Sequence, residues 1–444
     1  MNSSWEYPDA NHYWLLNAHV PTQLIAADET HPNSYEALTC CHLEVVAGKL
    51  SQIRQVDRFP QEFVPDSTLP AVDLERRLLL PGFVDLHTHL DKGHIWPRSP
   101  NPDGTFTSAI TATKADAQFF YAARDLYRRM DFGLRCSYAH GTVAIRTHID
   151  VFGQQAKIGF EVFTELRDEW RDRIQLQGAC LVSTDEYLTP SGIALADQMA
   201  EIGGILGGVA YWHDNLEAEL RQLLTLAQAR QLPVDVHVDE NGNPNSEALR
   251  LLAQVAQELD FSLPIICGHC CSLGVQAPER VQDTLNLVSQ SPMGIVSLPL
   301  CNLYLQGRHP LEQPHWRGIP PLAAIHEAHI PLAFANDNCR DPFHAFGDHD
   351  MLEVLTQTLR IGQLLPPYDR WCASVTQVPA TLMGLTSQGI GQLQVGQPAD
   401  WNLFSARFFS ELFARAQGDR LIIRRGKVVD APLPDYRELD DLMA

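Results

Sequence analysis

The strongest constraint on the fold is an alternation of short apolar runs with segments of helical period, from residue 78 to beyond residue 330. The apolar runs have the length of buried strands, and the segments between them have the spacing of amphipathic helices. Strands that alternate with helices in this way pair in parallel. We count eight such runs, at residues 78–86, 142–149, 174–182, 205–211, 233–239, 263–270, 294–300 and 330–336.

Eight strand–helix units are the content of a (β/α)8 TIM-like barrel. A chain of 444 residues is long enough for one such barrel and a small second unit. The two ends of the chain have short β-like runs and turn residues instead of helices. The sequence therefore predicts an α/β protein with a barrel at residues 76–392. Residues 1–75 and 393–444 are predicted to form one small β-sandwich domain together.

The charge of the chain limits its partners. The formal net charge is −21, whereas nucleic acids and anionic membranes require a basic surface. The first residues lack the basic and apolar regions of a secretory signal, and the ten cysteines include no C-x-x-C pair. We therefore predict a cytoplasmic protein with reduced thiols, which binds a small molecule and neither nucleic acid nor membrane.

Four metal-ligand side chains stand at the ends of the predicted strands. His87 and His89 end the first run, and because they are two residues apart on a strand they point the same way. His237 stands in the fifth run, and Asp337 follows the eighth. Such strand ends meet at one rim of a barrel. Three imidazoles and one carboxylate leave room for water on a single divalent ion, which lowers the pKa of that water to about 7.

Two further residues at this rim are candidates for proton transfer. Glu240 lies three residues beyond His237, where it can reach a substrate without competing for the metal. His269 ends the sixth run and is free to orient the attacking water. Two other zinc patterns do not apply. The histidines of residues 326–329 are three apart, not the four of H-E-x-x-H, and the H-x-E…P-C-x-x-C pattern of the small deaminases is absent.

These segments resemble the amidohydrolase superfamily, specifically its cytosine deaminase-like branch. The resemblance covers nearly the whole chain and includes PGFVDLHTHLDK, RTHID, VDVHVDE, NLYLQGR and FANDNCRDPF. It implies an iron or zinc enzyme that is often a homo-oligomer. By position, it implies that the metal ligands are His87, His89, His237 and Asp337, that Glu240 is the proton shuttle, and that His269 holds the attacking water.

The predicted substrate pocket departs from cytosine deaminases at two positions. Ser183 stands where those enzymes have the glutamine that binds the pyrimidine edge, and Asn338 replaces their second aspartate. The Asp-Asn pair is similar to the branch that contains N-isopropylammelide amidohydrolase. Because a site built around a different set of hydrogen-bond partners discriminates strongly, cytosine is not the predicted substrate.

Five more residues are candidates for the pocket. Lys92 closely follows the first histidine pair, as does His94, and an alternative for Lys92 is an ion pair with an acidic patch. Gln306 and Arg308 are placed to bind a polar ring edge, although Arg308 has the same alternative. Phe343 is placed to stack on the ring.

Together these residues predict a metal-dependent hydrolytic deaminase of a small N-heterocycle, with metal-activated hydroxide as the nucleophile. The alternatives within the superfamily are an N-alkylaminotriazine amidohydrolase and a cyclic amide or lactam hydrolase. Binuclear members of the latter type carry a lysine on strand 4, and residues 204–211 contain none, so one ion per chain is predicted. A non-catalytic binding protein on a degenerate barrel would show gaps in the metal set, and this sequence shows none.

Overall fold

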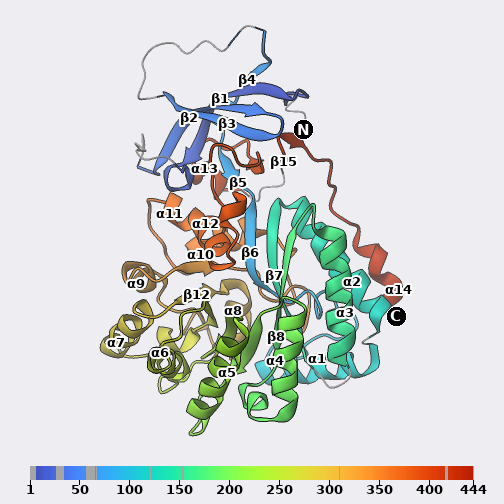
Figure 1. The fold of residues 1–444 in the computed structure, drawn as a ribbon, viewed down its shortest axis with the longest axis vertical. Coiled ribbons are helices and arrows are strands. Elements are labelled where there is room, and N and C mark those ends of the chain that lie inside the picture. The colour runs from blue at the N-terminus through green and yellow to red at the C-terminus, as the bar shows by residue number, and fades with distance from the viewer. Residues whose placement is uncertain are drawn as a thin grey trace. The chain divides into compact units, whose positions relative to one another are not determined.

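The computed structural model describes residues 7–26, 35–56, 66, 68–120, 122–151, 155–309, 311–415 and 419–443. The chain forms two compact units (Figure 1). One consists of residues 1–84, 138–143 and 365–432, and the other of residues 85–137, 144–364 and 433–444. Within the described ranges, no helix has both the length and the apolar character needed to cross a membrane.

Parallel strands organise the larger unit. One sheet has the order β6-β7-β8 and another the order β13-β12-β11-β10-β9, so strands that are consecutive in the sequence are neighbours. The predicted α/β fold with parallel strands is therefore confirmed. The strands are β6 (Phe83–Thr88), β7 (Thr142–Asp150), β8 (Gln175–Leu181), β9 (Leu206–Ala210), β10 (Val234–Val238), β11 (Ile265–His269), β12 (Met293–Ser297) and β13 (Leu332–Phe334).

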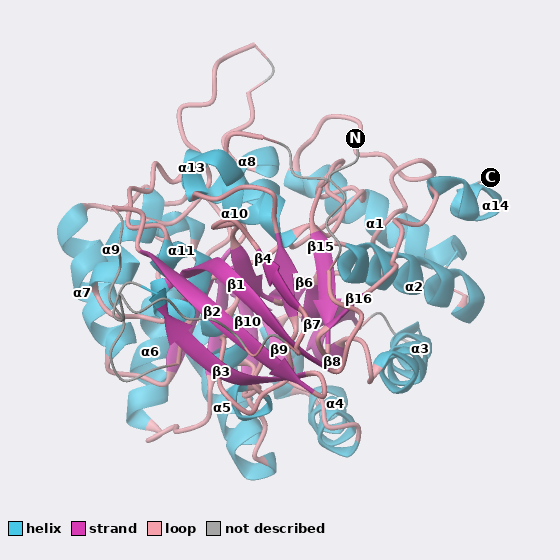
Figure 2. Ribbon diagram, turned by 90° about the horizontal axis from the view of Figure 1, so that it is seen from above, coloured by secondary structure: helices cyan, strands magenta, loops and turns pink. Residues whose placement is uncertain are grey.

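Helices lie around the outside of these strands (Figure 2). In α5, the leucines at 216, 220, 223 and 224 are buried on one face, as an amphipathic helix requires. The helices are α1 (Phe106–Phe120), α2 (Ala123–Ala139), α3 (Gln155–Trp170), α4 (Pro190–Glu201), α5 (Leu216–Arg230), α6 (Ala248–Glu258), α7 (Pro278–Ser289), α8 (Pro299–Leu305), α9 (Leu322–Glu327), α10 (Met351–Ile361) and α14 (Asp440–Met443).

The smaller unit has two four-stranded sheets, of order β3-β2-β1-β4 and β16-β15-β14-β5. Residues from both sheets share one buried core, which includes Leu15, Leu43, Leu79 and Trp401. Its elements are β1 (His12–Pro21), β2 (Leu38–Val46), β3 (Lys49–Gln55), β4 (Ala71–Asp73), β5 (Leu79–Pro81), β14 (Trp401–Leu403), β15 (Leu421–Arg424), β16 (Lys427–Val428), α11 (Asp369–Ala373), α12 (Gln377–Leu382) and α13 (Phe409–Leu412).

Two predicted runs differ in the structure. Residues 78–86 form two strands, because β5 pairs with β14 whereas β6 joins β7. The break falls at Gly82, where a Cβ atom would lie 2.4 Å from Cγ1 of Val143. The run at 294–300 also ends early, since α8 begins at Pro299, whose fixed φ suits the first turn of a helix. In both cases the residues on either side of the boundary are buried, so the pattern of apolar residues does not show where the strand begins or ends.

Candidate active site

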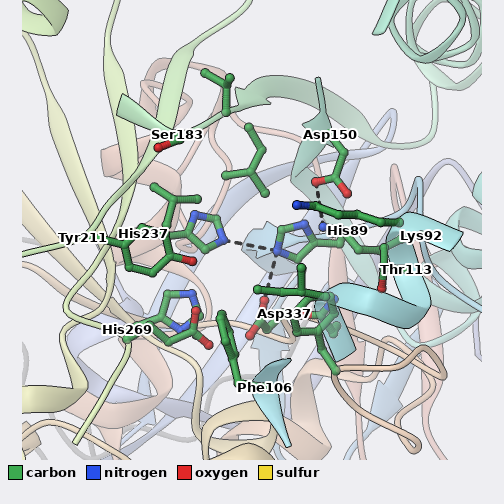
Figure 3. A pocket seen from close by; sticks show the side chains of 18 residues that line it. His89, Lys92, Phe106, Thr113, Asp150, Ser183, Tyr211, His237, His269 and Asp337 are labelled. Carbon is green, nitrogen blue, oxygen red and sulfur yellow. Dashed lines mark hydrogen bonds and ion pairs between the residues drawn. The ribbon is translucent and has the colours of Figure 1, made fainter. Parts of the chain in front are cut away.

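The four predicted metal ligands converge at the ends of β6, β10 and β13. Nε2 of His89 lies 3.2 Å from Oδ1 of Asp337 and 3.3 Å from Nε2 of His237, and Nε2 of His87 lies 3.6 Å from the same carboxylate oxygen. Figure 3 shows His89, His237 and Asp337 directed at one another. The backbone fixes the aspartate, because its N–H donates to the carbonyl of His87 at 2.8 Å.

The chemistry of this group fits a divalent cation. Among the described residues, none forms a hydrogen bond with either ring nitrogen of His87 or either carboxylate oxygen of Asp337, although all four atoms are buried. Burial lowers the pKa values of His87, His89 and His237 well below their ordinary value, so these imidazoles are neutral and can coordinate. Burial also raises the pKa of Asp337 to about 7, and a cation would favour its ionised form.

Glu240 and His269 lie beside this group and are linked by Asn302. Nδ2 of Asn302 donates to Nδ1 of His269 at 3.1 Å and to Oε1 of Glu240 at 3.4 Å. Burial, followed by the charge of Asp337, raises the pKa of Glu240 well above its ordinary value. Burial also lowers the pKa of His269 to about 3, although the bond from Asn302 opposes this. The site therefore holds a carboxyl group whose protonated form is favoured by burial, next to a neutral imidazole.

The hydrogen bond from Asn302 also fixes the tautomer of His269. An amide NH2 group only donates, so Nδ1 of His269 accepts and its proton is on Nε2. A protonated Nε2 cannot coordinate a metal but can donate to an oxygen. This matters because His269 lies close enough to be a ligand: His87, His237, His269 and Asp337 each place one ligand atom within 4.8 Å of the others.

A cavity of about 200 Å³ is lined by His89, His237, Glu240, His269 and Asp337, together with four of the residues predicted for the substrate. Lys92, Ser183, Asn338 and Phe343 all lie on its wall. In the view of Figure 3, Ser183 lies on one side of His237, and Lys92 lies on the other. The remaining wall is largely apolar or aromatic, and it includes Phe106, Ile110, Leu181, Val209 and Tyr211.

Lys92 has both of the roles considered from the sequence. It lines the pocket, and its Nζ lies 2.7 Å from Oδ1 of the buried Asp150 and 5.5 Å from the ring centroid of Phe343. Burial alone would lower the pKa of Lys92, but the carboxylates of Asp150 and Asp91 more than offset this effect and raise it. The pocket therefore contains a fixed ammonium–carboxylate pair.

Three other candidates lie outside the lining of this cavity. Gln306 donates through Nε2 to the backbone carbonyl of Glu240 at 3.2 Å, so it contacts the loop that carries Glu240. Arg308 is exposed and donates to the carbonyl of Tyr304 at 2.6 Å, which is not the acidic partner considered from the sequence. The ring of His94 faces His349, with the two Nε2 atoms 3.2 Å apart.

Sequence reasoning gave no role to several residues that the structure brings to the site. Asn302 opens the N-x-x-L-Q-G-R segment, and Asp150 ends the R-T-H-I-D segment, so both stood in motifs that were already singled out. Phe106 and Tyr211 gave no such signal, because an aromatic residue at a helix start or strand end is usually part of the core.

Comparison with known proteins agrees with this geometry. Residues 148–430 match the model of the amidohydrolase family. The chain is 41% identical over 437 residues to pterin deaminase from Rhizobium rhizogenes, an alignment that covers 98% of each protein. The chain is thus a hydrolase that acts on carbon–nitrogen bonds other than peptide bonds. It belongs to the amidohydrolase family, as the motifs predicted.

More distant relatives agree in fold. N-isopropylammelide isopropyl amidohydrolase from a Pseudomonas species is 24% identical over 306 residues, which cover 65% of this chain and 70% of that protein. The structure of 5-methylcytosine deaminase from Klebsiella pneumoniae, liganded with 5-fluorocytosine, superposes with a TM-score of 0.79. It covers 95% of this chain and 98% of its own at 24% identity, which supports a common fold.

Proposed function

We propose that the protein is a metal-dependent hydrolytic deaminase that removes the amino group of a pterin-like N-heterocycle. The observation that carries this proposal is the position of the buried Glu240, which lines the same pocket as the histidine–aspartate group. Because burial raises the pKa of Glu240, its carboxyl group favours the protonated form and can take part in the proton transfers that the departure of an amine needs. The full-length similarity to pterin deaminase supports the choice of heterocycle.

The residues that would hold the ion are His87, His89, His237 and Asp337, as predicted from the sequence. A zinc or iron ion, when bound, supplies activation of water at neutral pH. One ion is proposed at this site, because β9 has the sequence Leu-Gly-Gly-Val-Ala and offers no lysine to bridge a second.

The side chains around the ion divide the proton transfers. The Nε2–H group of His269 donates to the oxygen of the attacking water and so orients it. Asp337, with a pKa of about 7, accepts a proton from that water. Glu240 delivers its proton to the ring nitrogen beside the reacting carbon. Asp337 then passes the proton that it took from water to the amine as the carbon–nitrogen bond breaks, and the proton left on the new hydroxyl group returns to Glu240. Water is consumed and ammonia is released.

The walls of the pocket suit a flat, polar ring. Phe106, Tyr211 and Phe343 offer aromatic surfaces, on which a heterocycle can stack. Ser183 and Asn338 offer hydrogen-bond donors and acceptors for the ring edge, and the Lys92–Asp150 pair offers both charges.

The same proposal includes the architecture of both units. Single bridges between Ser183 and Val209 and between Thr88 and Asp337 connect the two parallel sheets on both sides. This pattern supports closure of the eight strands into a (β/α)8 barrel, with the metal site at its carboxyl rim. The core shared by the two sheets of the smaller unit supports a β-sandwich built from both chain ends.

The test is an ammonia-release assay of the purified enzyme with pterin, 5-methylcytosine, guanine and N-isopropylammelide. We expect ammonia from pterin, and loss of this activity in Glu240→Gln. Glu247→Gln is the matched control, because Glu247 pairs with Arg280 and does not line the pocket. Release of isopropylamine alone would identify an alkylaminotriazine hydrolase. Ring opening of a cyclic amide without ammonia would overturn the deaminase assignment.

A further inference from the structure

A second group of ligand-type side chains lies outside the pocket lining. His94, Cys339 and His349 are buried, and each places one ligand atom within 4.8 Å of the other two. His94 belongs to the loop after β6, and the other two residues belong to the loop after β13. None of the three lines the active-site cavity.

The spacing of the two imidazoles fits a common metal ion. Their Nε2 atoms are 3.2 Å apart. Zinc binds histidine nitrogen at about 2.0–2.1 Å with tetrahedral angles, so two imidazoles on one zinc ion have their nitrogens about 3.3 Å apart. A direct hydrogen bond between the two rings would give a similar distance. The thiol of Cys339 favours the zinc ion over the direct hydrogen bond. A thiol is a soft metal ligand, and a hydrogen bond between two imidazoles would need no third group beside it.

A glycine lies beside the ring of His349. In α2, a Cβ atom on Gly133 would lie only 3.0 Å from Nε2 of His349, so the glycine leaves room beside the nitrogen. The ring of His94 is held by an edge contact with Phe132, at 4.9 Å between centroids. Burial lowers the pKa of His94 well below its ordinary value, which leaves the imidazole neutral and able to coordinate.

Backbone geometry also marks the cluster. His94 and His349 have φ angles of 65° and 56°, a left-handed conformation that costs a non-glycine residue of order 1–3 kcal/mol. The N–H of His94 donates to the carbonyl of Cys339 at 3.1 Å, so the two loops are already joined at this point. Such strain persists only where the surroundings over-determine it, and a shared ligand is one way to do so.

We propose that His94, Cys339 and His349 bind a zinc ion that is separate from the active-site ion. This ion joins the loop after β6, which carries Lys92, to the loop after β13, which carries Asn338 and Phe343. Because these three residues line the pocket, the second ion stabilises the pocket wall and does not take part in the chemistry. Coordination releases the thiol proton of Cys339 to solvent, and one tetrahedral position remains for a fourth donor.

Metal content tests the proposal. The full-length enzyme is saturated with zinc, desalted and analysed for zinc and protein. We expect two equivalents per chain in the wild type and one in Cys339→Ser. Cys372→Ser is the matched control and should keep two, because this buried cysteine belongs to the smaller unit and to none of the metal-ligand groups found among the described residues. A binuclear active site would also hold two ions, but Cys339→Ser would then keep both, and this result would overturn the proposal.

Cobalt substitution gives a second readout that does not depend on the variant folding. A thiolate bound to Co²⁺ produces a charge-transfer absorption band, whereas the nitrogen and oxygen ligands of the active site do not. We expect the band in the wild type and in Cys301→Ser, whose thiol lies near the active-site Asp337, and its loss in Cys339→Ser. Absence of the band from the cobalt-loaded wild type would overturn the proposal and leave His94 and His349 as a hydrogen-bonded pair.

Discussion

Asn302→Ala tests the role of a residue that contacts Glu240 and His269, the two side chains proposed to act on protons. The substitution removes the donor at 3.1 Å from His269 Nδ1 and at 3.4 Å from Glu240 Oε1. A buried polar atom that loses its partner costs about 1–3 kcal/mol. If this cost falls on the transition state, kcat/KM decreases roughly 5- to 150-fold, since about 1.4 kcal/mol corresponds to a factor of ten. The decrease should be in kcat, because Asn302 does not line the substrate cavity.

The assay is ammonia release at several pH values, together with urea unfolding. Without Asn302 the tautomer of His269 is no longer fixed, so the pH profile of kcat should change shape as well as height. Asn402→Ala is the matched control, because Asn402 is also buried, donates to the carbonyl of Gly141 at 3.2 Å, and lies in the smaller unit. It should lose stability only. A value of kcat/KM within twofold of the wild type for Asn302→Ala would refute the reasoning.

Three further predictions concern other charged groups of the larger unit. Glu240→Gln should keep its bound metal, measured by elemental analysis, while kcat falls at least 100-fold, because general acid–base catalysis contributes about 10²–10⁴. Lys92→Ala should lower the free energy of unfolding by about 3–5 kcal/mol by leaving the buried Asp150 unpaired, and the double variant with Asp150→Ala should be more stable than the single one in urea. Burial raises the pKa of Asp341 from 3.8 to about 6. Between these two pH values the folded state therefore binds more protons than the unfolded state. The free energy of unfolding falls as pH rises through this window. In urea titrations, Asp341→Asn should lack this loss of about 3 kcal/mol, and an unchanged pH dependence would contradict the assignment.

The sequence predicted that four ligand-type side chains would lie together because their chemistry and their position coincide. His87, His89, His237 and Asp337 are ligand-type residues, and all of them stand at ends of apolar runs. In a parallel α/β fold those ends meet at one edge, so topology alone places them together. The same logic predicted that Glu240 would lie near these four side chains, since a residue just past a strand end cannot move far from it.

The rest of the pocket could not be predicted in this way. Gln306 and Arg308 are in the same short segment as Asn302, yet only Asn302 contacts the side chains of Glu240 and His269, whereas Gln306 reaches the backbone carbonyl of Glu240. The segment begins in α8 and leaves the helix after Leu305, so Asn302 lies on the helix whereas Gln306 and Arg308 lie beyond its end. The direction of each side chain depends on where that helix begins and ends and on how it is rotated. Phe106 comes from α1, whose contribution to the pocket depends on tertiary packing and not on any local pattern.

Backbone conformation explains why the strand ends work as a site. Asp239, His269 and Asp337 have φ angles of 50°, 68° and 64°, so three non-glycine residues at strand ends adopt the left-handed conformation. Each costs of order 1–3 kcal/mol, and each is held by neighbours, as in the bond from Asp337 N–H to His87. The left-handed residue ends the strand abruptly while its side chain stays buried beside the neighbouring strand. The strain is therefore part of the arrangement that brings polar side chains from separate strands to one point, and a glycine at 269 or 337 would relieve it only by removing the functional group.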